Sequence, residues 1–170
     1  MQHNIFPGSL TAAYTATQYT NGLTPRYGDT FHDQANGKRY IFLKNLGSGS
    51  IAAKTGAVSL TTDRAAFGCR APSTTIAGNE LCNAGIRVSG ATTVAQNESG
   101  WFQIGGSATV TASSDTTTAD LGVVYSNQSA GQVEAAADSA AGIRGTIGIA
   151  ATTTASGDVV VHLTYNCWGL

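Results

Sequence analysis

The segment 100–112 constrains the fold of this chain most. It reads Gly-Trp-Phe-Gln-Ile-Gly-Gly-Ser-Ala-Thr-Val-Thr-Ala, so that a Gly-Gly pair stands between two runs of large apolar or β-branched residues. Aromatic and β-branched residues fit the pleated surface of a strand, and paired glycines accept the backbone angles of a tight turn. The segment therefore predicts a β-hairpin that turns at Gly105 and Gly106.

Short extended runs separated by small residues recur along the rest of the chain. Asn36-Gly37 follows the run 29–33 and precedes the run 38–45, and both of its residues accept the positive φ of a type I′ hairpin turn. Strands at this spacing predict an all-β fold, a compact antiparallel β-sandwich or barrel. Further strands are expected at 57–61, 85–89, 92–96, 120–126, 131–135, 145–150 and 157–165. Helix is nearly absent, and the Ala-rich window 134–141 fits either a helical turn or a loop.

The 170 residues are enough for one main domain with an extension. Residues 1–25 contain two prolines and a spread of Thr and Ala without helical or strand period, so we expect an extended N-terminal arm that is mobile until it meets a partner. Residues 26–170 are the expected β domain. Within it the polar segment 62–84 is expected to be an irregular excursion.

The composition indicates a protein that works through its surfaces. Charged residues are 11% of the chain, against about 25% in an ordinary globular domain. Hydroxyl and amide side chains take their place, and these pair across an interface without the desolvation cost of a buried charge. The net charge of −1 offers no electrostatic attraction for nucleic acid or an anionic membrane, so neither is an expected partner.

The cysteines and the N-terminus indicate the compartment. Three cysteines leave at least one unpaired in a monomer, which argues against the disulfide framework of a small secreted domain. Cys69 and Cys82 either bridge the loop between them or remain two thiols. The N-terminus lacks the basic and apolar regions of a secretion signal, and no apolar run approaches the ~20 residues of a membrane span. We expect assembly in a cytoplasm.

No arrangement of residues in the sequence predicts catalysis. His3, His32 and His162 are far apart, and the motifs of serine hydrolases, zinc proteases and dithiol enzymes are missing. His32 fits a polar hairpin position and His162 a hydrogen-bonded strand position. We therefore predict a protein that is not an enzyme, with no catalytic residue, no cofactor and no metal site.

Aromatic residues are the remaining candidates for a site. Five of them could form a platform on which a sugar stacks, although burial in a core or an interface explains them better in a chain so poor in acids: Trp101, Phe102, Tyr125, Tyr165 and Trp168. The C-terminal residues 165–170 include Trp and Leu, which are costly to solvate unless they dock on their own domain or on a neighbour. The predicted interface residues belong to the arm and to this end of the chain: Ile5, Phe6, Tyr14, Tyr19, Trp168 and Leu170.

Several of these segments resemble small structural proteins of tailed bacteriophages that are encoded with the head genes. The resemblance is carried by 28–53 and by the Trp-Phe-Gln segment 100–110, its strongest part, and the elements at 123–133 and 148–150 fit the same plan. It extends from Tyr27 to Leu163. The chain departs from the pattern in its arm, in the segment between Cys69 and Cys82, and in residues 165–170.

This resemblance to head decoration or cement proteins implies a small β domain that binds the outside of a capsid, often as a trimer. It implies the major capsid protein and further copies of the chain as partners, and a place on the capsid surface of a virion assembled in the host cytoplasm. The pattern holds no catalytic residues. The leading hypothesis is a protein that clamps neighbouring capsid subunits, with the arm as a strap. The alternative is a host-surface or carbohydrate-binding module of a phage tail or fibre.

Overall fold

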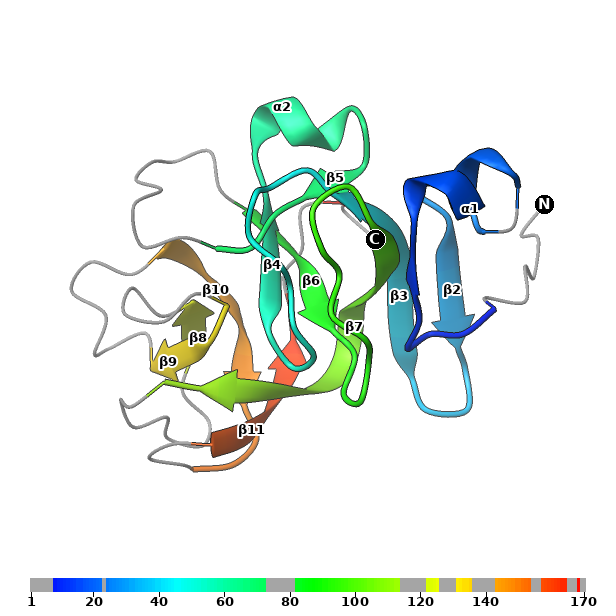
Figure 1. The fold of residues 1–170 in the computed structure, drawn as a ribbon. Coiled ribbons are helices and arrows are strands. Elements are labelled where there is room, and N and C mark those ends of the chain that lie inside the picture. Colours follow the sequence, from blue (N-terminus) through cyan, green and yellow to red (C-terminus); the bar gives the residue numbers. More distant parts are fainter. Residues whose placement is uncertain are drawn as a thin grey trace.

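The computed structural model describes residues 8–22, 24–72, 82–113, 122–125, 131–135, 143–153, 157–164 and 168. These residues form short helices and many strands (Figure 1). In chain order the elements are β1 (Ala13–Tyr14), α1 (Ala16–Thr20), β2 (Thr30–Asp33), β3 (Lys38–Asn45), β4 (Gly56–Ser59), α2 (Thr61–Arg64), β5 (Gly68–Cys69), β6 (Cys82–Arg87), β7 (Ser99–Ala112), β8 (Gly122–Tyr125), β9 (Val133–Ala135), β10 (Ile143–Ala150) and β11 (Gly157–Leu163). The prediction of an all-β fold is confirmed.

The later strands close into a barrel. The second half of β7 pairs antiparallel with β11, and antiparallel pairs then join β11 to β10, β10 to β8 and β8 to β9. A single parallel pair between Val133 of β9 and Ala112 of β7 completes the circle. We call this unit the second barrel. Of the two architectures that the strand spacing allows, the structure therefore contains the barrel.

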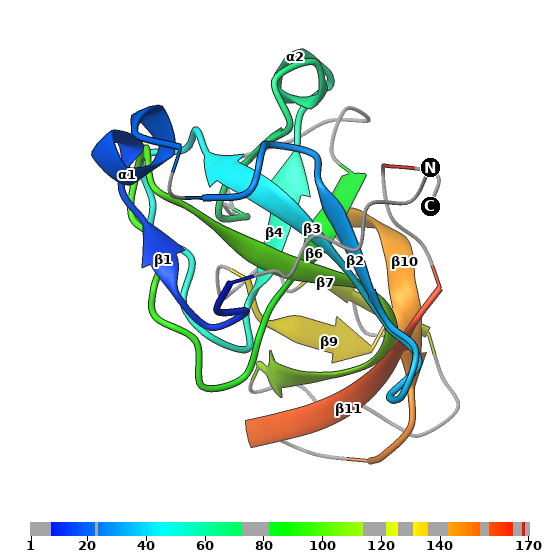
Figure 2. The same cartoon turned by 90° about the vertical axis from the view of Figure 1, so that its right-hand side faces the viewer.

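The earlier strands close in the same manner around the first half of β7. That half pairs with β3 on one edge and with β6 on the other, and β6 pairs with β4. Strand β5 lies parallel to the end of β3, and a bridge between Val58 and Arg70 joins β5 to β4. We call this unit the first barrel. It shares β7 with the second barrel, and Figure 2 shows β7 running from one to the other.

Each barrel encloses its own apolar core. The alternation of side chains along a strand sends every second residue inward, and the inward residues of the two barrels form separate clusters. The first contains Ile41, Leu43, Ile51, Ala57, Cys69, Ala84, Val94, Phe102 and Ile104. The second joins two residues from strands of the first barrel, Val58 of β4 and Ile86 of β6, to the inward residues of the second barrel: Ala108, Val110, Ala112, Val123, Val133, Ile147, Ala150, Val159, Val161 and Leu163.

The outer face of β3 and β7 is also buried, and the N-terminal segment covers it. Tyr40, Phe42 and Trp101 form a third cluster on this face, with Trp101 edge-on to Phe42 at 5.4 Å between ring centroids. Residues from the first part of the chain pack on it: Leu10, Tyr14, Tyr19, Tyr27 and Phe31. This explains why consecutive residues of β3 are all buried, rather than every second one.

The predicted hairpin at Gly105-Gly106 is wrong. Residues 99–112 form one strand that bends at the glycines, where it leaves β3 and joins β11. A bulge precedes the bend, since Arg39 pairs with Gly105 while Tyr40 pairs with Gln103, and Gly106 has φ +75°. Paired glycines permit a bend as readily as a turn, and what selects the bend is β11, which lies fifty residues away in the sequence.

Other expectations are met in part. The hairpin at Asn36-Gly37 is confirmed, but its turn has four residues, with a positive φ (+63°) at Gly37 and not at Asn36. Residues 92–96 contribute one bridge, Ile51 to Val94, instead of a strand. The segment 62–84 was expected to be irregular, yet it contains part of α2, β5 and the start of β6. Glu134 and Ala135 belong to β9, and residues 136–141 lie outside the described residues.

The bend in β7 generates a prediction about Gly106. A Cβ at this position would overlap the carbonyl oxygen of Gly37, whereas a Cβ at Gly90, which has the similar φ of +73°, meets nothing within 4 Å. We expect Gly90→Ala to lower the free energy of unfolding by about 1 kcal/mol for its left-handed backbone. We expect Gly106→Ala to lower it by about 2–4 kcal/mol because the overlap with backbone adds to that cost. Urea denaturation measures both, and equal losses would show that the bend tolerates a side chain.

Candidate functional site

The outer face of the second barrel is a sheet surface on which Asp158, paired with Lys54, is the charged residue among those described. Cross-strand partners place Ser107 beside His162, Thr109 beside Val160 and His162 beside Ile149, all pointing away from the core. Ile149 is 41% exposed, one of two large hydrophobic residues that the described part of the chain leaves exposed. We name this surface the β7–β11–β10 face and define it by Ser107, Thr109, Thr111, Ile149, Val160 and His162.

Ser107 and His162 are hydrogen-bonded across this face. The Oγ of Ser107 lies 2.7 Å from Nδ1 of His162, which confirms the expectation of a hydrogen-bonded strand histidine. A serine hydrolase needs in addition a carboxylate that orients the imidazole and donors for an oxyanion. Among the hydrogen bonds of the described residues, none joins His162 to a carboxylate. The pair thus acts as a cross-strand contact that fixes the orientation of the histidine ring.

Arg87 is a buried structural residue that the sequence patterns did not indicate. Its side chain is fully buried in β6, and its guanidinium donates hydrogen bonds to backbone carbonyls on both sides of it. The acceptors are the oxygens of Leu10 (3.3 Å), Thr11 (2.9 Å), Ala12 (2.8 Å), Thr92 (3.0 and 3.1 Å) and Trp101 (2.8 Å). Burial lowers the pKa of Arg87 to about 10, so the group stays charged at neutral pH. In the sequence, the one sign of this role is a single charged residue between apolar neighbours in a predicted strand.

The Arg87 contacts attach the N-terminal segment to the domain. Residues 13 and 14 pair with β7 as strand β1, and α1 follows with a capping box between Thr15 and Gln18. The expectation of an arm without helix or strand therefore differs from the structure over residues 8–22, which lie against their own domain. Residues 1–7, and with them the predicted interface residues Ile5 and Phe6, lie outside the described residues.

The tyrosines predicted for an interface face inward. Tyr14 packs edge-on against Phe42 with 5.7 Å between ring centroids, and its hydroxyl accepts a hydrogen bond from the backbone of Ser9. Tyr19 stacks on Tyr27 at 3.9 Å. Both rings are half-buried and help to cover the third cluster, so their first role is within the chain.

Trp168 docks on the first barrel, and Leu170 lies outside the described residues. Nε1 of Trp168 donates to the carbonyl of Ala84 at 3.1 Å, and the indole ring stacks on Phe67 with 5.7 Å between ring centroids. Trp101 and Phe102 are fully buried, which rules out the proposed platform of five rings and confirms core packing for these two. The side chains of Tyr125 and Tyr165 lie outside the described part.

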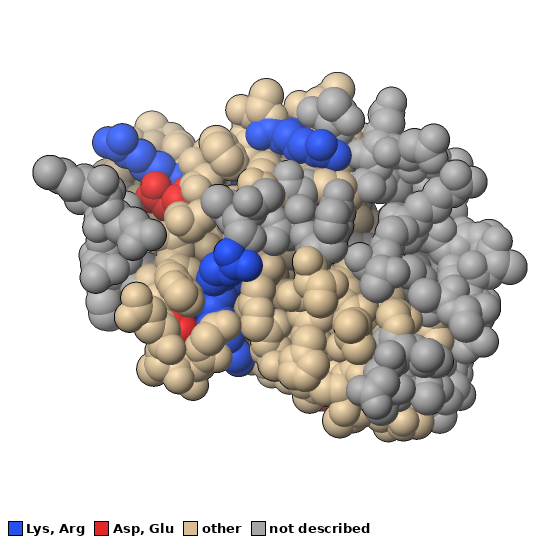
Figure 3. All heavy atoms as spheres, turned by 180° about the vertical axis from the view of Figure 1, so that it is seen from behind, with Lys and Arg blue, Asp and Glu red and all other residues tan. Residues whose placement is uncertain are grey.

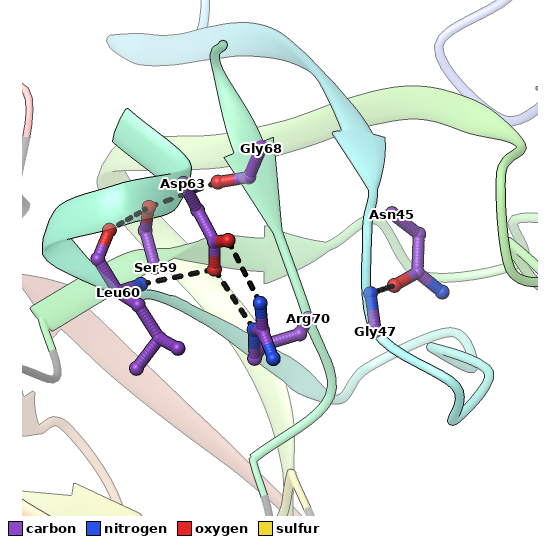
Figure 4. A network of polar contacts seen from close by, with 7 residues as sticks. All are labelled: Asn45, Gly47, Ser59, Leu60, Asp63, Gly68 and Arg70. Carbon is purple, nitrogen blue, oxygen red and sulfur yellow. Dashed lines mark hydrogen bonds and ion pairs between the residues drawn. The ribbon is translucent and has the colours of Figure 1, made fainter. Parts of the chain in front are cut away.

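The loop that carries Phe67 is braced by polar contacts (Figure 4). Arg70 donates to both carboxylate oxygens of Asp63, at 2.8 and 2.7 Å, and this pairing raises the pKa of Arg70. Asp63 also accepts from the backbone of Leu60, and the hydroxyl of Ser59 donates to the carbonyl of Gly68 at 2.9 Å. The Asp63 side chain is 6% exposed and that of Arg70 27%, so the carboxylate side of the pair is shielded from solvent. These contacts fix both ends of the loop between β4 and β5.

Cys69 and Cys82 are thiols and do not form the bridge that the sequence left open. No three His, Cys, Asp or Glu side chains of the described residues are grouped to hold a metal ion. Within the same residues, no helix is long and apolar enough to cross a membrane.

The Arg87 contacts predict a large loss of stability in Arg87→Met. The variant would leave several buried carbonyls without a donor, and we expect the free energy of unfolding to fall by about 3–5 kcal/mol. Arg87→Lys keeps the charge but supplies fewer donors, so its loss should be intermediate. Arg39, an exposed arginine of β3, is the matched control, and Arg39→Met should change stability by less than about 0.5 kcal/mol.

Faster proteolysis within residues 8–22 of Arg87→Met would show that the segment has detached. A wild-type rate of cleavage there would contradict the attachment.

The two described thiols should differ in reactivity. Burial raises the pKa of the Cys69 thiol, and the nearby carboxylate of Asp63 raises it further, so at neutral pH the reactive thiolate is scarce. Cys82 is half-buried. We expect a thiol-alkylating reagent to modify Cys82 at least about tenfold faster than Cys69 in the folded protein, as followed by peptide mass spectrometry. Equal rates in the native protein, with equal rates after unfolding as the control, would contradict this environment for Cys69.

Comparison with known proteins gave a structural match at low similarity. No family model matches the chain, and no curated protein matches it. One similar solved structure is the N base of the head fibre gp8.5 in bacteriophage phi29, with 11% sequence identity and a TM-score of 0.47. The match covers 74% of this chain and 94% of the other.

Proposed function

We propose that this protein is a non-enzymatic structural protein of a phage virion, a decoration or cement protein that binds and stabilises the shell of the major capsid protein. The observation that carries the proposal is the β7–β11–β10 face. Its hydroxyl groups and its exposed Ile149 can be buried against another protein without the desolvation cost of an ion. The pairing of β7, β11 and β10 holds these side chains on one side of the second barrel.

The resemblance seen in the sequence supports the same proposal. The segments that carry it, 28–53 and 100–110, contain β3 and most of β7, which are adjacent strands of the first barrel. Trp101 and Phe102, from its strongest part, are fully buried there. The shared pattern therefore describes the scaffold, and the surfaces on that scaffold are this chain's own.

The proposed partners are the major capsid protein and other copies of this chain, and neither nucleic acid nor a membrane is among them. The proposed location is the capsid surface of a virion assembled in the host cytoplasm. A capsid repeats one subunit many times, so a modest affinity for each site can add up to a strong total effect where one oligomer engages several sites. The strap role for residues 8–22 is not retained, because these residues cover the chain's own core.

A carbohydrate-binding module of a phage tail or fibre is the second candidate. The stacked rings of Phe67 and Trp168 favour it, because Phe67 is 38% exposed and an exposed aromatic ring can stack on a sugar. Binding to a glycan array distinguishes this candidate from the first.

The test is co-sedimentation with purified heads of the phage that encodes the chain. We expect the protein to sediment with heads from which it has been depleted, and to raise the temperature at which they release DNA. Ile149→Lys places a charge on the exposed apolar residue of the β7–β11–β10 face and should weaken binding by about tenfold or more. Ala35→Lys adds the same charge to the exposed turn between β2 and β3 and should leave binding unchanged. Selective binding to a glycan without binding to heads would overturn the capsid proposal.

A further inference from the structure

The chain contains two Asn-Gly pairs, Asn21-Gly22 and Asn36-Gly37. In such a pair the backbone nitrogen of the glycine can attack the side-chain amide carbon of the asparagine, because glycine has no Cβ that blocks the approach. All four residues are exposed to solvent. The sequence alone makes the two pairs equivalent, so a difference in their reactivity has to come from the fold.

The end of α1 restrains the first pair. The nitrogen that would attack belongs to Gly22, and its N–H donates to the carbonyl of Tyr19 at 3.0 Å. The N–H of Asn21 donates to the carbonyl of Thr17 at 3.0 Å. Asn21 has ψ 2°, which turns the Gly22 nitrogen towards the backbone nitrogen of Asn21 and away from its Cβ. Attack would therefore require a large rotation about the Cα–C bond, and this rotation breaks the hydrogen bond to Tyr19.

The second pair has no such restraint on its attacking nitrogen. Residues 34–37 form the exposed turn between β2 and β3, which projects from the molecule in Figure 1. Among the hydrogen bonds of the described residues, none uses the N–H of Gly37. Gly37 has φ +63°, and a Cβ built on it would meet nothing within 4 Å. The turn thus leaves space around the atoms that would react.

Basic residues beside the turn favour the attack. The backbone nitrogen attacks after it has lost its proton, and a positive charge nearby stabilises the negative nitrogen that remains. Lys38 and Arg39 follow the turn directly in the sequence, and Arg39 is exposed. Figure 3 shows Lys and Arg side chains on the half of the molecule that carries this hairpin.

Asp33 holds the side chain that would react. Its carboxylate accepts hydrogen bonds from Nδ2 of Asn36 at 2.7 Å and from the backbone N–H of Asn36 at 3.3 Å. The bond from the Asn36 side chain lowers the pKa of Asp33, so the carboxylate is ionised at neutral pH. Because water competes for a contact at the surface, such a hydrogen bond slows a reaction that breaks it by about two- to tenfold. The contact delays the attack on Cγ of Asn36 and does not prevent it.

We propose that Asn36 is a site of spontaneous covalent modification, at which Asn36-Gly37 becomes an aspartate or isoaspartate linkage in the folded protein, and that Asp33 slows the reaction. The Gly37 nitrogen bonds to Cγ of Asn36, the Cγ–Nδ2 bond breaks, and Nδ2 leaves as ammonia with the proton that the nitrogen has lost. Water then opens the cyclic imide. Opening at Cγ gives aspartate, and opening at the backbone carbonyl gives isoaspartate, in which the main chain runs through the side chain.

The product weakens the turn and its contact with β7. A carboxylate at position 36 repels Asp33, where the amide donated a hydrogen bond to it. An isoaspartate also lengthens the main chain of the turn by one atom, directly before Gly37. The carbonyl oxygen of Gly37 lies against Gly106, where a Cβ would overlap it. The modification therefore reaches the bend at which β7 passes from the first barrel to the second.

The first experiment is incubation of the purified, folded chain at mildly alkaline pH, followed by mass spectrometry of its peptides, since the conversion adds about 1 Da. We expect conversion at Asn36 to be at least about tenfold faster than at Asn21, where backbone hydrogen bonds have to break first. In urea, which removes the fold, the two pairs should react at similar rates. Equal rates in the folded protein would overturn the proposal. So would an unmodified Asn36 in the folded protein when both pairs react in urea.

Two variants test the reacting groups. Asn36→Gln has to close a larger and less favourable ring, so it should remain unmodified over the same period. Asp33→Ala releases the Asn36 amide and should be modified about two- to tenfold faster than wild type. A rate equal to or below that of wild type in Asp33→Ala would contradict the restraint by Asp33.

Two further measurements test the effect on the fold. Asn36→Asp mimics the aspartate product and should melt at a lower temperature than Gln34→Glu, which adds the same charge to the turn but keeps the contact between Asn36 and Asp33. The amide NMR signals of Gly105 and Gly106 should move as conversion proceeds, whereas those of α1 should not. Unmoved signals at both glycines in the converted protein would contradict the link to the bend. Binding to phage heads takes no part in these measurements, so their outcome is independent of the proposed function.

Discussion

Both barrels depend on the hydrogen bonds of one strand, β7. Its first half is bonded to β3, β6 and β1, and its second half to β11 and β9. Neither barrel closes without it, so the change of direction at Gly105 and Gly106 sets how the two barrels are placed. The three apolar clusters follow from this arrangement, since β7 contributes inward residues to both barrels and Trp101 to the outer cluster.

Arg87 links the first barrel to the segment that covers it. A buried cation normally has a carboxylate partner, but here backbone carbonyls surround it. Carbonyl dipoles do not titrate, so the attachment does not depend on the ionisation of a partner. The segment gains fixed positions for Leu10, Thr11 and Ala12, and it shields Tyr40, Phe42 and Trp101 from water.

Local patterns predicted the strands well and their connections poorly. The run 157–165 became β11 and the Asn36-Gly37 hairpin formed, because alternation and turn residues act over a few neighbours. The pair Gly105-Gly106 was misassigned because the choice between a turn and a bend depends on β11. Residues 8–22 looked unstructured since their partners, Arg87 and β7, are distant in the sequence. The exposed residues of the candidate site were harder to predict than the strands. Phe67 and Ile149 were not singled out, because a residue's exposure depends on what the rest of the chain covers.

The shared strand also imposes an order on folding during synthesis. The residues of β1 are made before their partners Ser99 and Gly100, which follow some eighty-five residues later. Until then the ribosome presents a chain whose first barrel lacks a side and whose N-terminal segment lacks its strand partner and Trp101 of the outer cluster. The Thr-rich composition of residues 9–20, with a single Leu, suits this interval, since a segment with so little apolar surface stays solvated. The segment 13–14 thus reaches its final position only after β7 has been made.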